Sequence, residues 1–361
     1  MLALLSVVAL IAVLTLYARR GARFARESAA GRIGTGMLLG MLGLGFVWMV
    51  QLPFSVVGLW WERRHGISKQ SYFDVIVGSW FGLAGVFVFA SLAILIGMGF
   101  AGLFRRRWWL AAAPVFVGVG AFVSFVNPYL LSPQLHPLRK PAIAQDARRL
   151  ERAEHLAHIP VKVEKVRKQT TAPNAEAVGI GPSRRVILWD TLLDGRFKRN
   201  EIRVILAHEF GHHARHHIPK GIGWYALFAL PIAWLVSVVT RRRGGLYQPE
   251  AVPLALLTVV ALQVLTMPIQ SMLTRRIEAE ADWVSLQTTR DPASARSLFH
   301  RLAKESLSEP RPPTWAYVLF DDHPTIVQRI AMANAWEARR AGLPEARNSS
   351  TARLQSSRLH R

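Results

Sequence analysis

Six stretches of the chain are almost wholly apolar, and all but the first are long enough to cross a lipid bilayer. They are residues 2–17, 36–61, 75–104, 110–131, 221–240 and 252–273. A transmembrane helix needs about 20 such residues. The first stretch is short, but its arginines follow the apolar run, whereas a signal peptide carries its positive charges before it. We therefore expect a mainly α-helical, polytopic membrane protein with about six transmembrane helices.

Between and after these stretches lie segments with the mixed polar and apolar pattern of a domain outside the membrane. Helical patterns occupy residues 141–159, 293–306 and about 320–340, and short strands are expected at 161–166, 177–180 and 185–189. These patterns divide the chain into N-terminal membrane helices (1–131), a first extramembrane part (132–220), a membrane hairpin (221–273), a second extramembrane part (274–340) and a disordered basic tail (341–361).

The composition agrees with a membrane protein. Hydrophobic residues make up 51% of the 361, the mean hydropathy is +0.21 and the formal net charge is +22. Such values are typical of a multi-spanning protein with basic loops. The arginine clusters adjoin the apolar stretches, so the expected partner is the lipid bilayer and not nucleic acid. The absence of cysteine excludes disulfide bonds and a thiolate zinc site.

One polar segment, residues 200–217, has the pattern of an amphipathic helix and contains the motif H-E-x-x-H. Asn200 is the expected N-cap, and apolar residues then recur at helical spacing. His208 and His212 are four residues apart and therefore project from one face of the helix. Two neutral imidazoles in this arrangement can hold a zinc ion. Glu209 is left free to act as a general base on the attacking water.

A zinc hydrolase needs a third protein ligand, and residues 275–282 (RRIEAEAD) are the best source of one. Glu278 and Asp282 are i, i+4 neighbours, so Glu278 can bind the metal while Asp282 orients a metal-bound histidine from behind. Glu280 is the alternative ligand. His213, His216 and His217 are expected to be solvated residues at the helix end. The metzincin pattern fails, because Arg215 and Ile218 occupy its glycine and histidine positions.

Five blocks in order resemble the integral-membrane zinc metalloproteases typified by the type I CAAX prenyl protease. The resemblance covers about residues 35–335, and six expected spans compare with seven in the eukaryotic members. In the first block, Ile67 and Ser68 replace the Phe and Asn of the family pattern. The blocks are residues 62–70 (ERRHGISKQ), 174–193 (the two strands with NAEAVGIG and RVILWDTLL), 208–212 (HEFGH), 276–282 (RIEAEAD) and 323–329 (HPTIVQR).

The resemblance implies a gluzincin-like metalloprotease domain of helices plus a small sheet, split by the membrane hairpin. It implies one Zn²⁺ held by His208, His212 and Glu278, with Glu209 as the catalytic carboxylate. It also implies that Asp282 supports a metal ligand. The substrate backbone would bind to Asn174, Ala177, Val178 and Gly179. The substrate or the oxyanion would be contacted by His323 and Arg329. From the residues alone, Asn174 is equally a turn residue, and His323 a residue before proline that does no chemistry.

These features predict a membrane-embedded zinc metalloendopeptidase that hydrolyses membrane-associated, lipidated or misfolded polypeptides. A transporter or scaffold with a structural zinc site is one alternative. A site-2-type intramembrane protease is another, but its motif lies within a span, whereas here Arg203 and Arg215 flank the motif. The sequence does not specify the oligomeric state.

The two indications of membrane orientation conflict. Residues 18–35, 105–107 and 241–243 lie on the side opposite the H-E-x-x-H motif and are rich in arginine. By the positive-inside rule that side is cytoplasmic, which leaves the zinc site outside the cytoplasm. The family resemblance implies the reverse, a cell-membrane protein with a cytoplasmic catalytic domain.

Overall fold

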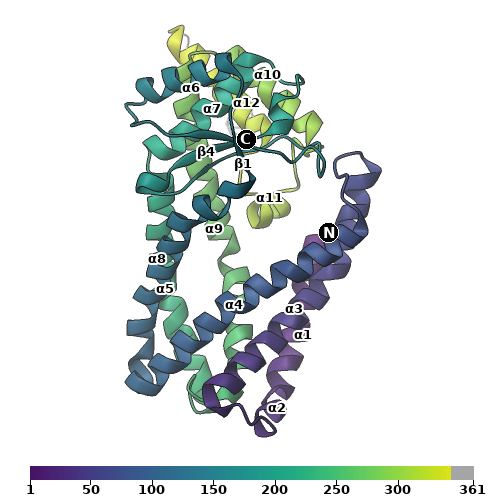
Figure 1. Cartoon of the computed structure of the whole chain (residues 1–361), viewed down its shortest axis with the longest axis vertical. Helices are drawn as coiled ribbons and strands as arrows, with labels where there is room; N and C mark the ends of the chain where they lie inside the picture. The colour runs from purple at the N-terminus through teal and green to yellow at the C-terminus, as the bar shows by residue number, and fades with distance from the viewer. Residues whose placement is uncertain (343–361) are drawn as a thin grey trace, which may run out of the picture.

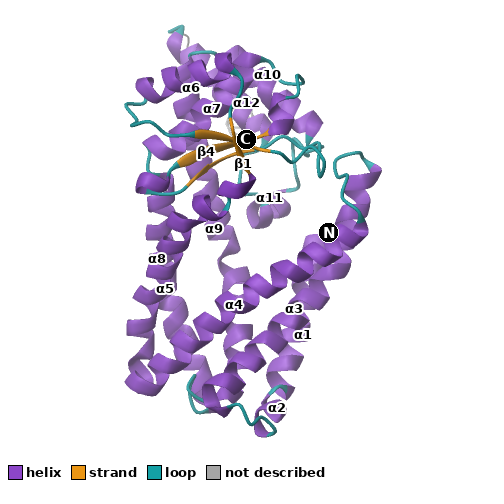
Figure 2. Cartoon of the chain, in the orientation of Figure 1, coloured by secondary structure: helices purple, strands orange, loops and turns teal. Residues whose placement is uncertain are grey.

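The computed structural model describes residues 1–342, and the predicted disordered tail lies outside them except for its first two residues. Long helices extend from one end of the molecule, and a compact unit of shorter helices and a sheet occupies the other end (Figures 1 and 2). The chain leaves the compact unit once, through the α8–α9 hairpin, and returns to it. This arrangement agrees with the mainly α-helical, polytopic fold expected from the hydropathy pattern.

Five continuous segments are long and apolar enough to cross a membrane, and one of them, Tyr72–Gln134, contains two helices that meet at the 3₁₀ turn Arg105–Arg107. Each of the six expected spans therefore corresponds to a helix. Many large apolar side chains on these helices are exposed, as expected for surfaces that face lipid. The helices are α1 (Leu2–Arg20), α3 (Gly31–Arg64), α4 (Tyr72–Phe104), α5 (Trp108–Leu130), α8 (His217–Thr240) and α9 (Val252–Thr289), with the short α2 (Ala22–Arg26) after α1.

The compact unit is a four-stranded sheet packed against helices. Its strand order is β1-β2-β4-β3, with β2 and β4 parallel and the other pairs antiparallel, so β3 lies at an edge. Its core is formed by apolar side chains such as Leu188, Phe210 and Phe299. The elements are β1 (Leu135–Pro137), α6 (Pro141–Ala153), β2 (Val161–Glu164), β3 (Ala175–Val178), β4 (Arg185–Trp189), α7 (Arg199–Ala214), α10 (Pro292–Glu305), α11 (Thr314–Phe320) and α12 (Ile326–Arg340).

Several boundaries differ from the predicted ones. The edge strand begins at Ala175 and ends before Gly179, which has a positive φ of 83° and begins the turn into β4. The N-cap of helix α7 is Lys198, two residues before the predicted Asn200, and the Glu201 carboxylate accepts a hydrogen bond from the backbone N–H of Lys198 at 2.7 Å. Asn200 is therefore inside the first turn. Strand β1 and helix α11 were not predicted.

Helix α9 joins the membrane to the compact unit. Its 38 residues make it about 57 Å long at 1.5 Å per residue, nearly twice the ~30 Å hydrocarbon thickness. Its C-terminal turns leave the apolar stretch and pack against α7. Gly211 lies at this crossing, where an added Cβ would be 3.2 Å from the Val284 side chain. The glycine allows the two backbones to approach closely.

Candidate metal centre and active-site cleft

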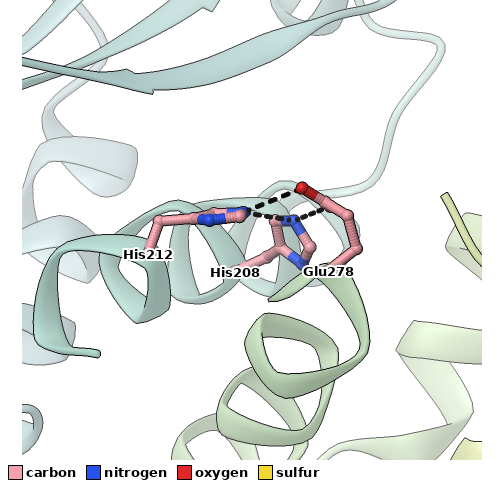
Figure 3. A group of neighbouring side chains, drawn as sticks. All are labelled: His208, His212 and Glu278. Carbon is pink, nitrogen blue, oxygen red and sulfur yellow. Dashed lines mark hydrogen bonds and ion pairs between the residues drawn. The ribbon is translucent and has the colours of Figure 1, made fainter. Parts of the chain in front are cut away.

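Three side chains converge where α7 crosses α9 (Figure 3). His208 Nε2 lies 3.1 Å from Glu278 Oε2 and 3.1 Å from His212 Nε2, and His212 Nε2 lies 3.5 Å from Glu278 Oε1. One ligand atom from each residue lies within 4.8 Å of the other two. The two imidazoles come from successive turns of α7, and the carboxylate comes from the part of α9 beyond the membrane hairpin.

The spacing of these atoms fits a shared divalent cation. Donors at about 2.0–2.1 Å from a tetrahedrally bound zinc ion are about 3.3 Å from one another. The three distances, 3.1, 3.1 and 3.5 Å, lie around this value, with the two histidines closest to different oxygens of the Glu278 carboxylate. Two unprotonated ring nitrogens at 3.1 Å repel each other, and a cation between them removes that repulsion. Two imidazoles and one carboxylate are also a ligand set typical of catalytic zinc sites.

Glu209 follows the first histidine and is buried beside the ligand group, where it lines an open cleft. Burial, the largest effect, raises the pKa of the Glu209 carboxyl to about 7. A carboxyl group whose pKa lies near neutrality can both accept and return a proton at ordinary pH. Its position makes it available to a water molecule at the ligand group without being a ligand itself.

Asp282 lies one turn beyond Glu278 on α9 and contacts the first histidine from behind. His208 Nδ1 donates to Asp282 Oδ1 at 2.9 Å, which leaves His208 Nε2 free to face the ligand group. The Arg329 guanidinium donates to both Asp282 oxygens, at 2.8 and 2.6 Å, and lies over the Phe299 ring. Arg329 also lines the cleft. The structure therefore brings Arg329 to Asp282 as well as to the substrate side of the site.

His323 approaches the ligand group from the segment between α11 and α12. Its Nε2 lies 3.3 Å from Glu278 Oε2, and its Nδ1 donates to Asp322 Oδ1 at 2.7 Å. The hydrogen bond to Asp322 is the main cause that raises the pKa of the His323 imidazole. Half of the side chain, 53%, is exposed to the cleft and the solvent. An imidazole N–H at this place would face the region that a substrate carbonyl would occupy.

The edge strand β3 borders the same cleft. Asn174 and Ala175 line it, and Ala177 and Val178 continue the strand up to Gly179. The outer edge of β3 pairs with no other strand within residues 1–342. An unpaired edge offers backbone N–H and C=O groups to an extended peptide. The cleft has a volume of about 520 Å³ and opens to the solvent.

A second, apolar cavity of about 680 Å³ lies among the membrane helices. Its walls come from α3, α4, α5, α8 and α9. Along α9 it extends as far as Gln270, Thr274 and Ile277, and Ile277 is the residue before the ligand-group carboxylate. The lining of the apolar cavity therefore extends along α9 to the residue that precedes Glu278.

The histidines at the end of α7 were only partly predicted. His216 is exposed, as expected, but the prediction was wrong for His213 and His217, which are both buried. His213 Nε2 donates to the Arg185 carbonyl at 3.1 Å, and His217 contacts His212 and Glu280. Glu280, the alternative ligand of the sequence analysis, thus bonds to a histidine that is outside the ligand group. The helical period of α7 could not predict the burial of His217, because a new helix begins at that residue.

The polytopic fold and a His-His-Glu group beside a free glutamate define the class as membrane metalloproteases. A family model described as peptidase family M48 matches residues 137–337, and the chain belongs to this family. It is 27% identical over 309 residues to the metalloprotease YhfN of Bacillus subtilis, covering 80% of this chain and 71% of the relative. It is 23% identical over 305 residues to a CAAX prenyl protease 1 homolog of Oryza sativa, covering 78% and 69%.

Among solved structures, the fold is similar to the crystal structure of Ste24p from S. mikatae, with a TM-score of 0.70 and 19% sequence identity. The similarity covers 82% of this chain and 75% of that one. The predicted membership of the membrane zinc metalloproteases of the CAAX prenyl protease type is confirmed, and so is the predicted class of enzyme. A transporter, a scaffold or a site-2-type protease is not favoured.

Proposed function

We propose that the enzyme is a zinc metalloendopeptidase whose ion is held by His208, His212 and Glu278. The observation that carries this proposal is the convergence of three ligand atoms from two helices within 4.8 Å, with Glu209 beside them and not among them. When bound, Zn²⁺ lowers the pKa of a water molecule to about 7 and polarises a carbonyl group.

Within this proposal the protein residues move the proton and stabilise charge. Glu209 accepts the proton of the attacking water and delivers it to the leaving amine. His323, oriented by its bond to Asp322, donates to the oxyanion that forms at the substrate carbonyl. Asp282 keeps the proton of His208 on Nδ1, so that Nε2 keeps its lone pair for the metal. Arg329 holds Asp282 and borders the substrate cleft.

The substrate is proposed to bind as an extended polypeptide along β3. The backbone groups at Ala177, Val178 and Gly179 pair with it as an added strand, and Asn174 bonds to it at the end of the cleft. The apolar cavity supports substrates that are anchored in the membrane, because its lining extends along α9 to Ile277, the residue before Glu278. We therefore propose membrane-associated polypeptides, either lipidated or misfolded, as the substrate class.

The test compares purified wild-type protein with Glu209→Gln for metal content and for cleavage of a generic peptide. We expect the variant to keep one zinc ion per chain and to lose at least about 100-fold in cleavage rate, the usual contribution of a general base. Glu337→Gln is the matched control, because Glu337 is an exposed residue of α12 whose ion pair within residues 1–342 is with Arg296. Wild-type cleavage by Glu209→Gln would contradict the proposal, as would a wild-type protein without bound zinc.

We further propose, by analogy with the family, that the compact unit lies on the cytoplasmic side of the cell membrane. The arginine turns at 105–107 and 241–243 then face outward, against the positive-inside rule. The chain has no cysteine, so labelling of a single engineered cysteine shows on which side of the membrane that residue lies. In intact cells a membrane-impermeant maleimide should label Arg242→Cys and leave Arg149→Cys, on α6, unlabelled until lysis. The opposite pattern would reverse the orientation.

A further inference from the structure

The second imidazole of the metal centre has a partner on its far side. His217 Nδ1 lies 3.0 Å from His212 Nδ1, and the two rings meet edge to face with centroids 4.9 Å apart. His217 is the first residue of α8, and its side chain is only 2% exposed. It reaches this place because His216 adopts a left-handed conformation with φ of 55°, which turns the chain sharply after α7. The contact joins the end of the motif helix to the start of the membrane hairpin.

The other ring nitrogen of His217 faces a carboxylate of α9. His217 Nε2 lies 3.2 Å from Glu280 Oε2, and Glu280 is two residues beyond the proposed ligand Glu278. The Glu280 side chain is 43% exposed and has two cationic neighbours, Arg215 at 3.8 Å and Lys220 at 3.5 Å. Glu280 is therefore an anion, and an ionised carboxylate can only accept hydrogen bonds.

With both imidazoles neutral, as a metal ligand and its partner require, these contacts allow one consistent placement of the protons. Because Glu280 only accepts, His217 carries its proton on Nε2 and has a lone pair on Nδ1. That lone pair accepts a hydrogen bond from His212 Nδ1, which must carry the proton of its ring. His212 Nε2 then has the lone pair, and it is this atom that faces Glu278 and His208. The opposite placement puts a proton on His212 Nε2 and prevents it from binding a cation.

We infer that His217 and Glu280 are positioning residues for the metal ligand His212. They select the tautomer of His212 and fix the orientation of its ring, as Asp282 does directly for His208. The two imidazole ligands are thus held from behind by two acidic residues of α9, the helix that also supplies Glu278. This inference rests on the proposed zinc centre and deepens it.

The experiment measures Zn²⁺ affinity by competition with a chromophoric chelator on the purified full-length protein. His217→Phe keeps the ring volume and removes the acceptor, so we expect about 10- to 100-fold weaker binding, the usual effect of losing such a partner. His217→Asn keeps an acceptor close to the position of Nδ1 and should recover part of the loss. His216→Asn is the matched control, because His216 is exposed and asparagine tolerates its left-handed backbone. It should bind Zn²⁺ as the wild type does.

Two further measurements separate positioning from a purely structural role. The visible absorption of the Co²⁺-loaded protein should change in His217→Phe, and more weakly in Glu280→Leu, because it reports on the geometry of the ligands. The melting temperature of the metal-free protein reports on the fold alone. The inference is overturned if His217→Phe binds Zn²⁺ within twofold of the wild type, or if His217→Asn and His217→Phe are equally weakened. Unchanged Zn²⁺ affinity in His208→Ala and His212→Ala would overturn the metal centre itself, and this inference with it.

Discussion

Replacing Asp282 with asparagine tests how the buried charges around His208 are organised. The Asp282 side chain is 2% exposed and serves two partners, the Nδ1 proton of His208 and the guanidinium of Arg329. The substitution removes the negative charge while keeping the shape of the side chain. Arg329, whose side chain is 13% exposed, then loses the only carboxylate to which it is hydrogen-bonded in the described structure.

The expected losses follow from these two contacts. Breaking a buried ion pair by removing one charge costs about 3–5 kcal/mol. For a protein of this size, that is a fall in melting temperature on the order of 10 °C. Replacing the carboxylate behind a metal-binding histidine by a neutral amide, a weaker acceptor, weakens metal binding by about 10- to 100-fold. Asp282→Asn should therefore lower both the stability of the metal-free protein and its affinity for Zn²⁺.

The double variant Asp282→Asn/Arg329→Met separates the two effects. It removes the unpaired guanidinium, so the melting temperature of the metal-free protein should recover by at least half. Zn²⁺ affinity should stay low, because His208 still lacks its carboxylate. Arg329→Met alone should keep Zn²⁺ affinity within a few-fold of the wild type, since Asp282 still accepts from His208. The reasoning is refuted if the double variant recovers Zn²⁺ affinity, or if Asp282→Asn melts and binds Zn²⁺ as the wild type does.

Two further predictions concern α7. The Glu201 carboxylate is buried, which by itself raises its pKa, but its bonds to Ser297, Lys198 and Arg301 outweigh burial and lower the pKa. Glu201→Gln should therefore lower the free energy of unfolding by about 3 kcal/mol at neutral pH, measured as a fall in melting temperature. This stability is present above the unfolded pKa near 4.5 and is lost as the pH falls through the folded pKa, so the difference between the variant and the wild type should shrink in acid; an equal difference at all pH values would contradict it. Gly211→Leu should force α7 and α9 apart and weaken Zn²⁺ binding, whereas Gly223→Leu, with no atom near its Cβ, should not; normal Zn²⁺ binding by Gly211→Leu would show that the crossing can adjust.

The features that the sequence predicted best depend on local periodicity. The apolar stretches became helices close to the expected bounds, because length and hydropathy suffice for a membrane span; the exception is α9, which continues past the predicted end at 273 to Thr289. His208 and His212 share a face of α7 because they are four residues apart. Glu278 was predicted as the third ligand from its i, i+4 relation to Asp282 and from the hairpin that returns α9 to the same membrane side. The structure brings all three together, and their role as ligands stays a prediction.

The features that were missed depend on contacts between elements. His217 was expected to be solvated, and its burial follows from the left-handed turn at His216. Glycine is the usual sign of such a turn in a sequence, and here the position is a histidine. Glu280 points away from the Glu278 face of α9, and only the position of α8 gives it a partner. Arg329 was expected at the substrate, and its bond to Asp282 requires α12 to lie against α9. Spacing along one helix cannot supply such information.

The metal centre and the membrane hairpin are one structural unit. Residues 278 and 282 face α7, since four residues make slightly more than one turn, whereas residue 280 lies about 200° from Glu278 around α9. Glu280 contacts the first turn of α8, so α9 is held from two sides close to the ligand group. The first turn of one membrane helix and the last turns of the other therefore complete the surroundings of His212 and His208. A displacement of either helix would change the position of a ligand, because α9 is continuous from the membrane to Asp282 and only Arg215 and His216 separate α7 from α8.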